Sequence, residues 1–168
     1  MTWSKQTRLR HATTRAQRHA NADDLAKSAR LIARFALETS ALEDAHVVQL
    51  LHHAIWKLTE AEHPKYHLPT RTRRAHERIL KGGNLQKELR HEHVYPRAEV
   101  VRRTLALRER SSVTEALKFL VDHAEACVVL KREATALDAA PGFGWKRYKK
   151  LDVYRFRDGE LRLLRPRK

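Results

Sequence analysis

Basic residues gather in three blocks of this chain, at residues 1–20, 64–90 and 146–168. The first block holds five bases and no acid, the second has a net charge of +6 and the third a net charge of +7, whereas residues 91–145 are neutral. Like charges repel in a compact state, so a chain with a net charge of +15 is expected to have a polyanionic partner. The blocks therefore indicate a folded body with basic surface patches, rather than a uniformly basic tail.

The first half of the chain has the apolar spacing of helices. Apolar residues recur at intervals of three, four and seven over residues 22–39 and again over about 41–61, and the short link between them predicts an antiparallel helical hairpin. A basic helix is expected over about 70–80, ended by Gly82-Gly83. Residues 1–21 have no sustained apolar face, so we expect a basic flexible arm there.

The second half changes character and predicts strands as well as helices. We expect helices over about 97–109, 112–125 and 132–139, a short strand-like segment at 93–95, and a strand over 126–130. The Asp158-Gly159 pair predicts a β-hairpin between residues 152–156 and 161–164. The expected fold is α+β and mainly helical. It forms one domain over 22–168, with a helical part at 22–90 and a small mixed α+β part at 91–168.

The composition excludes several classes of protein. Cys127 is the only cysteine, which rules out a disulfide within the chain and a cysteine-based zinc site, and favours a reducing, cytoplasmic compartment, where the protein could be nucleoid-associated. No segment approaches the roughly 18 apolar residues of a membrane-spanning helix, so no membrane partner is expected.

Nucleic acid is the polyanion that the charge pattern predicts, as DNA or RNA. Basic side chains that neutralise phosphates release condensed counterions, and aromatic residues interleaved with bases can stack on nucleobases. The residues expected to contact nucleic acid are Arg71, Arg73, Arg74, Arg78, Lys81, Lys87, Arg90, Trp145, Lys146, Arg147, Lys149 and Lys150. An alternative is a protein partner that docks on the acidic helices of residues 22–61.

One short segment, His91-Glu92-His93, could carry chemistry. On an extended backbone His91 and His93 share a face and Glu92 lies opposite. Imidazole and carboxylate groups suit a divalent cation such as Mg²⁺ or Zn²⁺, and hydrolysis of a phosphodiester needs a cation and a base for water. A metal-dependent nuclease is therefore the first enzymatic hypothesis.

Residues Glu92-His93-Val94-Tyr95-Pro96 resemble the first strand of the HNH, or His-Me finger, nucleases. The resemblance implies a two-stranded ribbon followed by a helix, with Glu92 as a metal ligand and His93 as the general base. Residues 127–130 and the helix that begins near Lys131 resemble the second strand and the helix of that family.

The chain departs from the family pattern in its later motif residues. Ala134 stands near the position of the family's second histidine ligand, the intermediate asparagine is absent, and so are the paired cysteines. Glu133, or His123 from the preceding helix, could replace the missing ligand, which makes His91, Glu92 and Glu133 the expected metal set. Two hypotheses follow: a metal-dependent endonuclease, and a non-catalytic DNA- or RNA-binding module that is a degraded nuclease relative or an accessory protein.

Overall fold

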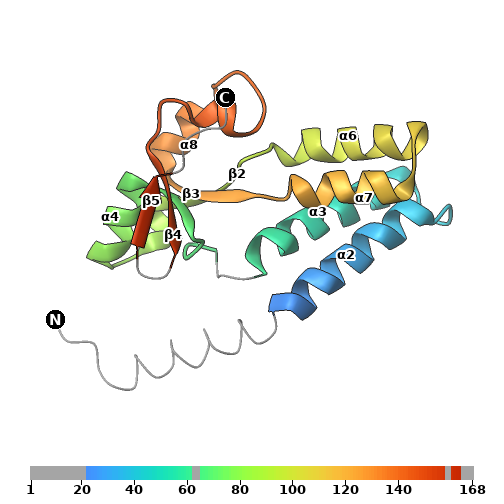
Figure 1. The fold of residues 1–168 in the computed structure, drawn as a ribbon, viewed down its shortest axis with the longest axis horizontal. Helices are drawn as coiled ribbons and strands as arrows, with labels where there is room; N and C mark the ends of the chain where they lie inside the picture. Colours follow the sequence, from blue (N-terminus) through green and yellow to red (C-terminus); the bar gives the residue numbers. More distant parts are fainter. Residues whose placement is uncertain (1–21, 62–64, 158–159, 164–168) are drawn as a thin grey trace.

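The fold is α+β and mainly helical, as expected, with four helices packed together at one end and a mixed sheet at the other (Figure 1). The computed structural model describes residues 22–61, 65–157 and 160–163. The basic arm expected at residues 1–21 lies outside the described residues, as do the turn residues Asp158-Gly159 and Leu164.

The helical end is built from two hairpins, α2 (Ala22–Glu38) with α3 (Asp44–Glu60) and α6 (Arg97–Arg110) with α7 (Val113–Asp122). Their apolar stripes meet in one core, in which Leu37, Leu51, Ile55, Val100 and Leu120 are fully buried or nearly so. Burial of a side chain of this size contributes about 1.5–3 kcal/mol. The helices predicted over 22–39, 41–61, 97–109 and 112–125 are confirmed, with ends that differ by up to three residues.

Five strands form one mixed sheet, in the order β2-β3-β1-β4-β5. The strands are β1 (Thr70–Thr72), β2 (Leu89–His93), β3 (Ala126–Leu130), β4 (Val153–Arg157) and β5 (Glu160–Leu163). Strand β1 runs parallel to β3, and the other neighbouring pairs are antiparallel. The strand expected at 126–130 and the C-terminal hairpin are confirmed.

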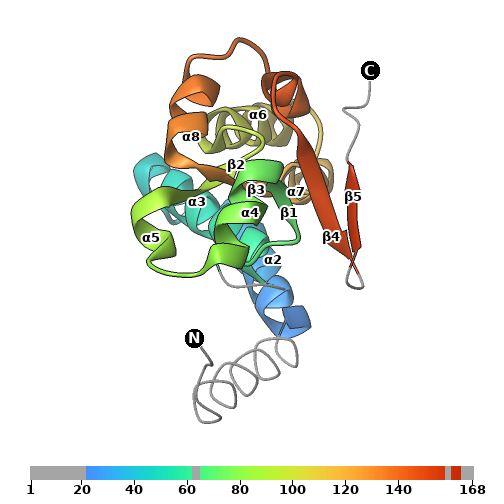
Figure 2. The same cartoon turned by 90° about the vertical axis from the view of Figure 1, so that its left-hand side faces the viewer.

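Short helices cover both faces of the sheet (Figure 2). Helix α4 (Arg73–Lys81) packs Ala75 into a cluster with Leu89 and Val128 on one face. Helix α8 (Lys131–Asp138) packs Ala134 and Leu137 with Cys127 and Val129 on the other. The one-turn helix α5 (Leu85–Glu88) lies between α4 and β2 in the chain, and the 3₁₀ helix η1 (Gly144–Tyr148) follows α8.

The α6–α7 hairpin is inserted between two paired strands. Strand β2 runs directly into the segment before α6, and α7 returns to β3, which pairs with β2 from His93↔Ala126 to Leu89↔Leu130. The backbone N–H of Val94 also donates to the carbonyl of Glu125 at 2.9 Å. The end of β2 therefore lies at the junction between the helical end and the sheet.

Two sequence expectations for this region differ from the structure in their bounds. The basic helix expected over 70–80 is confirmed, but it begins at Arg73, because Thr70–Thr72 instead forms β1 and pairs with β3 and β4. Thr72 caps α4 by accepting a hydrogen bond from the backbone N–H of Ala75 at 3.2 Å. The strand expected at 93–95 covers Leu89–His93, since the pairing with β3 begins earlier and the chain turns toward α6 after His93.

The loop expected at 141–145 ends in η1, and Gly144 is required where the two meet. Its φ is +68°, and a Cβ at this position would lie 2.3 Å from Cε1 of Tyr95. The close approach of backbone to ring places η1 beside the segment that follows β2. None of the helices in the described part of the chain has both the length and the apolar character of a membrane span.

Candidate functional site

A cavity of about 650 Å³ lies along the free edge of β2, where the sheet meets the helical end. Its walls come from α3, the residues before β1, α5, β2 itself, the start of α6, α8 and η1. The lining includes His52, Trp56, Lys65, Tyr66, Gln86, Arg90, His91, Glu92, His93, Arg97, Lys131, Asp138 and Arg147.

His91 and His93 lie side by side in this cavity, as the alternation of strand residues predicted. Their ring centroids are 5.0 Å apart. Trp56 of α3 covers the pair, stacked on His91 with centroids 5.3 Å apart and tilted toward His93 at 5.7 Å. The two imidazoles therefore join the sheet to the helical end through an aromatic contact.

Both imidazoles are buried, and their ring nitrogens have no hydrogen-bond partner among the residues that the structure describes. His91 is 6% exposed and His93 is 8% exposed. Within the described part of the chain, neither ring nitrogen of His93 has a hydrogen-bond partner, and neither does Nε2 of His91. Nδ1 of His91 lies 3.4 Å from Oε1 of Glu60, outside hydrogen-bond geometry. Buried polar atoms in proteins are normally satisfied, so these nitrogens indicate a place for a ligand or water.

The environment keeps both imidazoles neutral near pH 7. Burial lowers the pKa of His93 to about 3, and the neighbouring His91, Arg97 and His52 add to the effect. Burial also lowers the pKa of His91, although the carboxylate of Glu60 opposes that shift. A neutral imidazole can donate one hydrogen bond and accept one.

The N-terminus of α6 opens into the same cavity through Arg97 and Ala98. Pro96 is the N-cap residue, and no side chain caps this helix. The only acid in its first turn is Glu99, whose carboxylate is bound by Arg102 and Arg103 at 2.7 and 2.6 Å. The first turn of a helix carries free N–H groups and a partial positive charge, and both favour an anion.

Basic side chains outnumber acids in the lining. The two carboxylates, Glu92 and Asp138, are both engaged by Arg90, at 3.1 and 3.0 Å. Lys65 and Arg97 lie 5.2 and 5.1 Å from the ring of Trp56. Over the described ranges, Lys65, Arg97 and Lys131 form no ion pair with a carboxylate, so their charge is available to a ligand.

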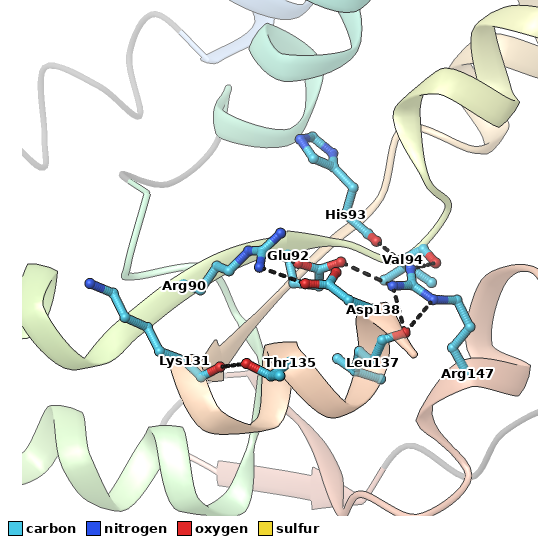
Figure 3. A network of polar contacts seen from close by, with 9 residues as sticks. All are labelled: Arg90, Glu92, His93, Val94, Lys131, Thr135, Leu137, Asp138 and Arg147. Carbon is cyan, nitrogen blue, oxygen red and sulfur yellow. Dashed lines mark hydrogen bonds and ion pairs between the residues drawn. The ribbon is translucent and has the colours of Figure 1, made fainter. Parts of the chain in front are cut away.

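Glu92, expected as a metal ligand, lies on the α8 side of the sheet. Its Oε1 accepts a hydrogen bond from Nη2 of Arg147 at 3.2 Å (Figure 3). Arg147 is itself buried and donates to the carbonyls of His93 and Leu137. Burial raises the pKa of the Glu92 carboxyl, while Arg90 and Arg147 oppose that shift.

Glu133, the other expected metal ligand, caps α8. It accepts hydrogen bonds from Oγ1 of Thr72 at 2.7 Å and from the backbone N–H of Leu130 at 2.9 Å. The structure thus does not bring Glu133 together with His91. No group of three histidine, cysteine or acidic side chains among residues 22–61, 65–157 and 160–163 is arranged to hold a metal ion. The alternative ligand His123 stacks on Phe119 with centroids 4.0 Å apart, and its Nδ1 lies 2.7 Å from the Phe119 carbonyl oxygen.

A second cleft, of about 510 Å³, lies between α4, α5 and the start of α8. Arg78 in this cleft is bound by Glu88, with Nε 2.6 Å from Oε2. The remaining bases form no ion pair within the described residues; they are Arg74, Lys81, Lys87, Lys131 and Arg132. Lys131 lines both this cleft and the cavity at β2, so the two form one basic surface.

The residues expected to bind nucleic acid divide into surface and internal groups. Exposed or part-exposed members of the basic surface are Arg74, Arg78, Lys81, Lys87 and Arg90. Arg73 is exposed but lines neither hollow and is paired with Glu77 at 3.2 Å. Lys146, Lys149 and Lys150 are exposed at η1 and just after it. Arg71 and Arg147 are instead buried, because β1 is an inner strand and η1 packs under the sheet. Trp145 is half-buried and donates from Nε1 to Glu125 at 3.0 Å, which anchors its loop.

Sequence reasoning missed five residues of this surface, namely Trp56, Lys65, Arg97, Lys131 and Arg132. Three of these residues carried a signal. Arg97 follows a proline at the start of a predicted helix, and Lys131-Arg132 directly follows an apolar strand, so both were expected at helix N-termini. Trp56 carried no such signal, since it lies within a helix whose apolar stripe explains its neighbours.

No protein-family model matches the chain, and the searches of curated proteins and of solved structures also found no match. The likeness of residues 92–96 to HNH nucleases therefore gains no support from these comparisons.

Proposed function

We propose that this protein binds nucleic acid through its phosphates. The supporting observation is the basic surface that runs from the α4–α5–α8 cleft, through Lys131, into the cavity at β2. Basic side chains outnumber acidic ones in both hollows, and neighbouring arginines contact the carboxylates among them.

Phosphate is the partner that such a surface favours. Arginine and lysine side chains without an internal carboxylate remain hydrated and carry counterions, and a polyanion that binds them releases its own condensed ions. Trp56 and Tyr66 lie beside these bases, with Lys65 Nζ at 5.2 and 5.6 Å from the two rings. Aromatic rings next to cations are typical of surfaces that bind single strands.

The test is binding of labelled DNA and RNA, single-stranded and duplex, measured by fluorescence anisotropy at about 50 mM salt, where phosphate contacts are strong. A triple variant, Arg74→Ala with Lys81→Ala and Lys131→Ala, is expected to lose at least tenfold in affinity, which corresponds to about 1.4 kcal/mol.

A matched control removes the same number of charges elsewhere. Arg30, Arg34 and Arg110 are exposed and line neither hollow of the basic surface. Their triple alanine variant has the same net charge as the test variant and is expected to bind nearly as well as the parent. If no nucleic acid binds in low salt, or if the two triple variants weaken binding equally, the proposal fails.

A second candidate is an HNH-like, metal-dependent endonuclease. One observation favours it: β2 and β3 form an antiparallel pair, α8 follows β3, and His93 stands at the end of β2. In this hypothesis His93 activates water, and Glu92 releases Arg147 and binds a metal cation in its place. Cleavage of DNA or RNA that requires Mg²⁺ or Zn²⁺ and disappears in His93→Ala is the expected result; cleavage retained in that variant would exclude it.

A further inference from the structure

We infer that the cavity at the edge of β2 binds a phosphomonoester, and that its source is the terminal phosphate of a nucleic acid strand. This inference rests on the proposed function and deepens it, since it assigns the cavity to a strand end and leaves the α4–α5–α8 cleft to the phosphates along the strand.

The first support is the arrangement around the start of α6. The uncapped first turn of this helix and the side chain of Arg97 face the cavity, and the acid of that turn, Glu99, is bound by Arg102 and Arg103. Lys65 and Lys131 line the cavity from other parts of the fold. A helix N-terminus with nearby cations is suited to phosphate oxygens.

The second support is independent of the helix and comes from the two histidines. His91 and His93 are more than nine-tenths buried, line the cavity, and have ring nitrogens without hydrogen-bond partners in the described chain. The charged groups that face them are Glu60, Lys65 and Arg97, together with His52. An anion placed between the imidazoles and α6 would accept hydrogen bonds from the rings and would favour their protonated form.

The charge and size of the cavity favour a monoester over the internal phosphates of a strand. A phosphomonoester carries about −1.5 to −2 charges at pH 7 and offers three acceptor oxygens, whereas each internal phosphate carries one negative charge. The volume of about 650 Å³ is typical of small-ligand pockets, which measure roughly 300–1,000 Å³. It therefore suits a terminal nucleotide and not a duplex.

The experiment compares single strands of one sequence that differ only at their ends. Strands with a 5′-phosphate, a 3′-phosphate or hydroxyl ends are titrated by anisotropy with the label at the opposite end. One of the phosphorylated strands is expected to bind about tenfold more tightly than the hydroxyl strand. AMP, titrated by calorimetry, tests the cavity without the rest of the strand and is expected to compete with the phosphorylated strand.

Variants assign the preference to the cavity. His93→Gln and Arg97→Ala are expected to abolish the tenfold preference, so that each variant binds the phosphorylated and the hydroxyl strands with equal affinity. Arg110→Ala removes the same charge from the far end of α6 and is expected to keep the preference. Arg97 is only half-buried, so its variant serves if His93→Gln does not fold.

Each outcome has a separate meaning. Equal affinity for all ends, with no binding of AMP, would overturn the inference and leave nucleic-acid binding in place. Binding of AMP without binding of any strand would overturn both the strand-end assignment and the proposed function, and would identify a free phosphorylated nucleotide as the ligand. A preference that survives in Arg97→Ala and in His93→Gln would show that the terminal phosphate binds elsewhere on the protein, and would overturn the assignment to this cavity.

Discussion

The guanidinium of Arg147 and the carboxylate of Glu92 form a buried ion pair, with Nη2 3.2 Å from Oε1 and both side chains less than one-tenth exposed. Arg147 also donates hydrogen bonds to carbonyl oxygens of β2 and α8. One side chain from η1 therefore ties the edge strand to the helix that covers it.

Removal of Arg147 should destabilise the fold. The variant Arg147→Met removes the donor to Oε1 of Glu92 and to the carbonyls of His93, Val94 and Leu137. Arg90 still contacts Oε2 of Glu92, so the loss should lie at or below about 3–5 kcal/mol, the cost of a fully broken buried pair. Chemical denaturation followed by circular dichroism measures the change. Lys146→Met is the control, because Lys146 is exposed next to it, and its effect should stay within about 0.5 kcal/mol. Equal stability of the two variants would show that the buried pair adds nothing.

Glu133 should act as a structural cap and not as a metal ligand. Glu133→Ala removes the acceptor of the Leu130 N–H and of the Thr72 hydroxyl, and we expect a loss of about 1–3 kcal/mol. Glu133→Gln keeps one acceptor oxygen and should lose less. The unfolding free energy of the parent should be the same with and without a chelator; a chelator effect that vanishes in Glu133→Ala would contradict the structural role.

Stability should fall as the pH falls from 7.5 to 5.5. The pKa of His93 is about 3 in the folded state and near 6.5 when unfolded, so the unfolded chain binds the proton first in this interval. The contribution of His93 is present above pH 6.5 and is lost as the pH falls from there toward 3, at about 1.4 kcal/mol per pH unit. His91, whose pKa is also lowered, adds in the same direction.

Denaturation of the parent and of His93→Gln at several pH values checks this dependence. The variant should show a smaller loss over the same interval. Identical pH profiles for the two proteins would mean that His93 is protonated or solvated in the fold.

The salt dependence of binding should report the number of phosphate contacts. A protein that neutralises Z phosphates of a duplex shows a slope of about −0.9Z in a plot of log K against log salt concentration, or about −0.7Z for single strands. Lys131→Ala should make the slope less steep by about one. Lys118→Ala is the control, because Lys118 is exposed and paired with Asp122 at 2.5 Å. A slope unaltered by Lys131→Ala would remove this residue from the interface.

Cys127 should be unreactive in the folded protein. It is fully buried in β3, and burial raises the pKa of its thiol well above the ordinary value, so the reactive thiolate is scarce. Thiol labelling with a chromogenic disulfide is expected to be negligible in the native state and to reach one equivalent in denaturant. Rapid labelling of the native protein would contradict the burial of β3.

Apolar periodicity was sufficient to predict most of the fold, because the long helices and β3 bury a continuous apolar stripe or run. It failed at Thr70–Thr72, a polar three-residue strand that exists through pairing with β3 and β4, partners that lie far along the chain. The same limit applies to the site. Strand alternation predicted that His91 lies beside His93. The hydrogen bond from Thr72 to Glu133, however, joins residues that are too distant in sequence for a local pattern to reveal.

Charge was a less reliable guide than periodicity, because it does not distinguish a surface base from an internal one. Arg147 belongs to a basic run and yet is buried, while Lys146, Lys149 and Lys150 around it are exposed. Arg97 was overlooked because its neighbourhood is nearly neutral; it matters through its place at the start of α6.

The insertion of α6 and α7 between β2 and β3 has a consequence for how the molecule comes apart. The chain leaves the sheet after His93 and re-enters it at Ala126. If α6 and α7 melted, the connection between these two paired strands would become a long flexible loop. Closing such a loop has a greater entropic cost. Local unfolding of the helical end should therefore destabilise the pairing of β2 with β3 in the sheet. A ligand in the cavity at β2 would contact residues of α3, α6 and β2 together, and would hold the helical end and the sheet in a single cooperative unit.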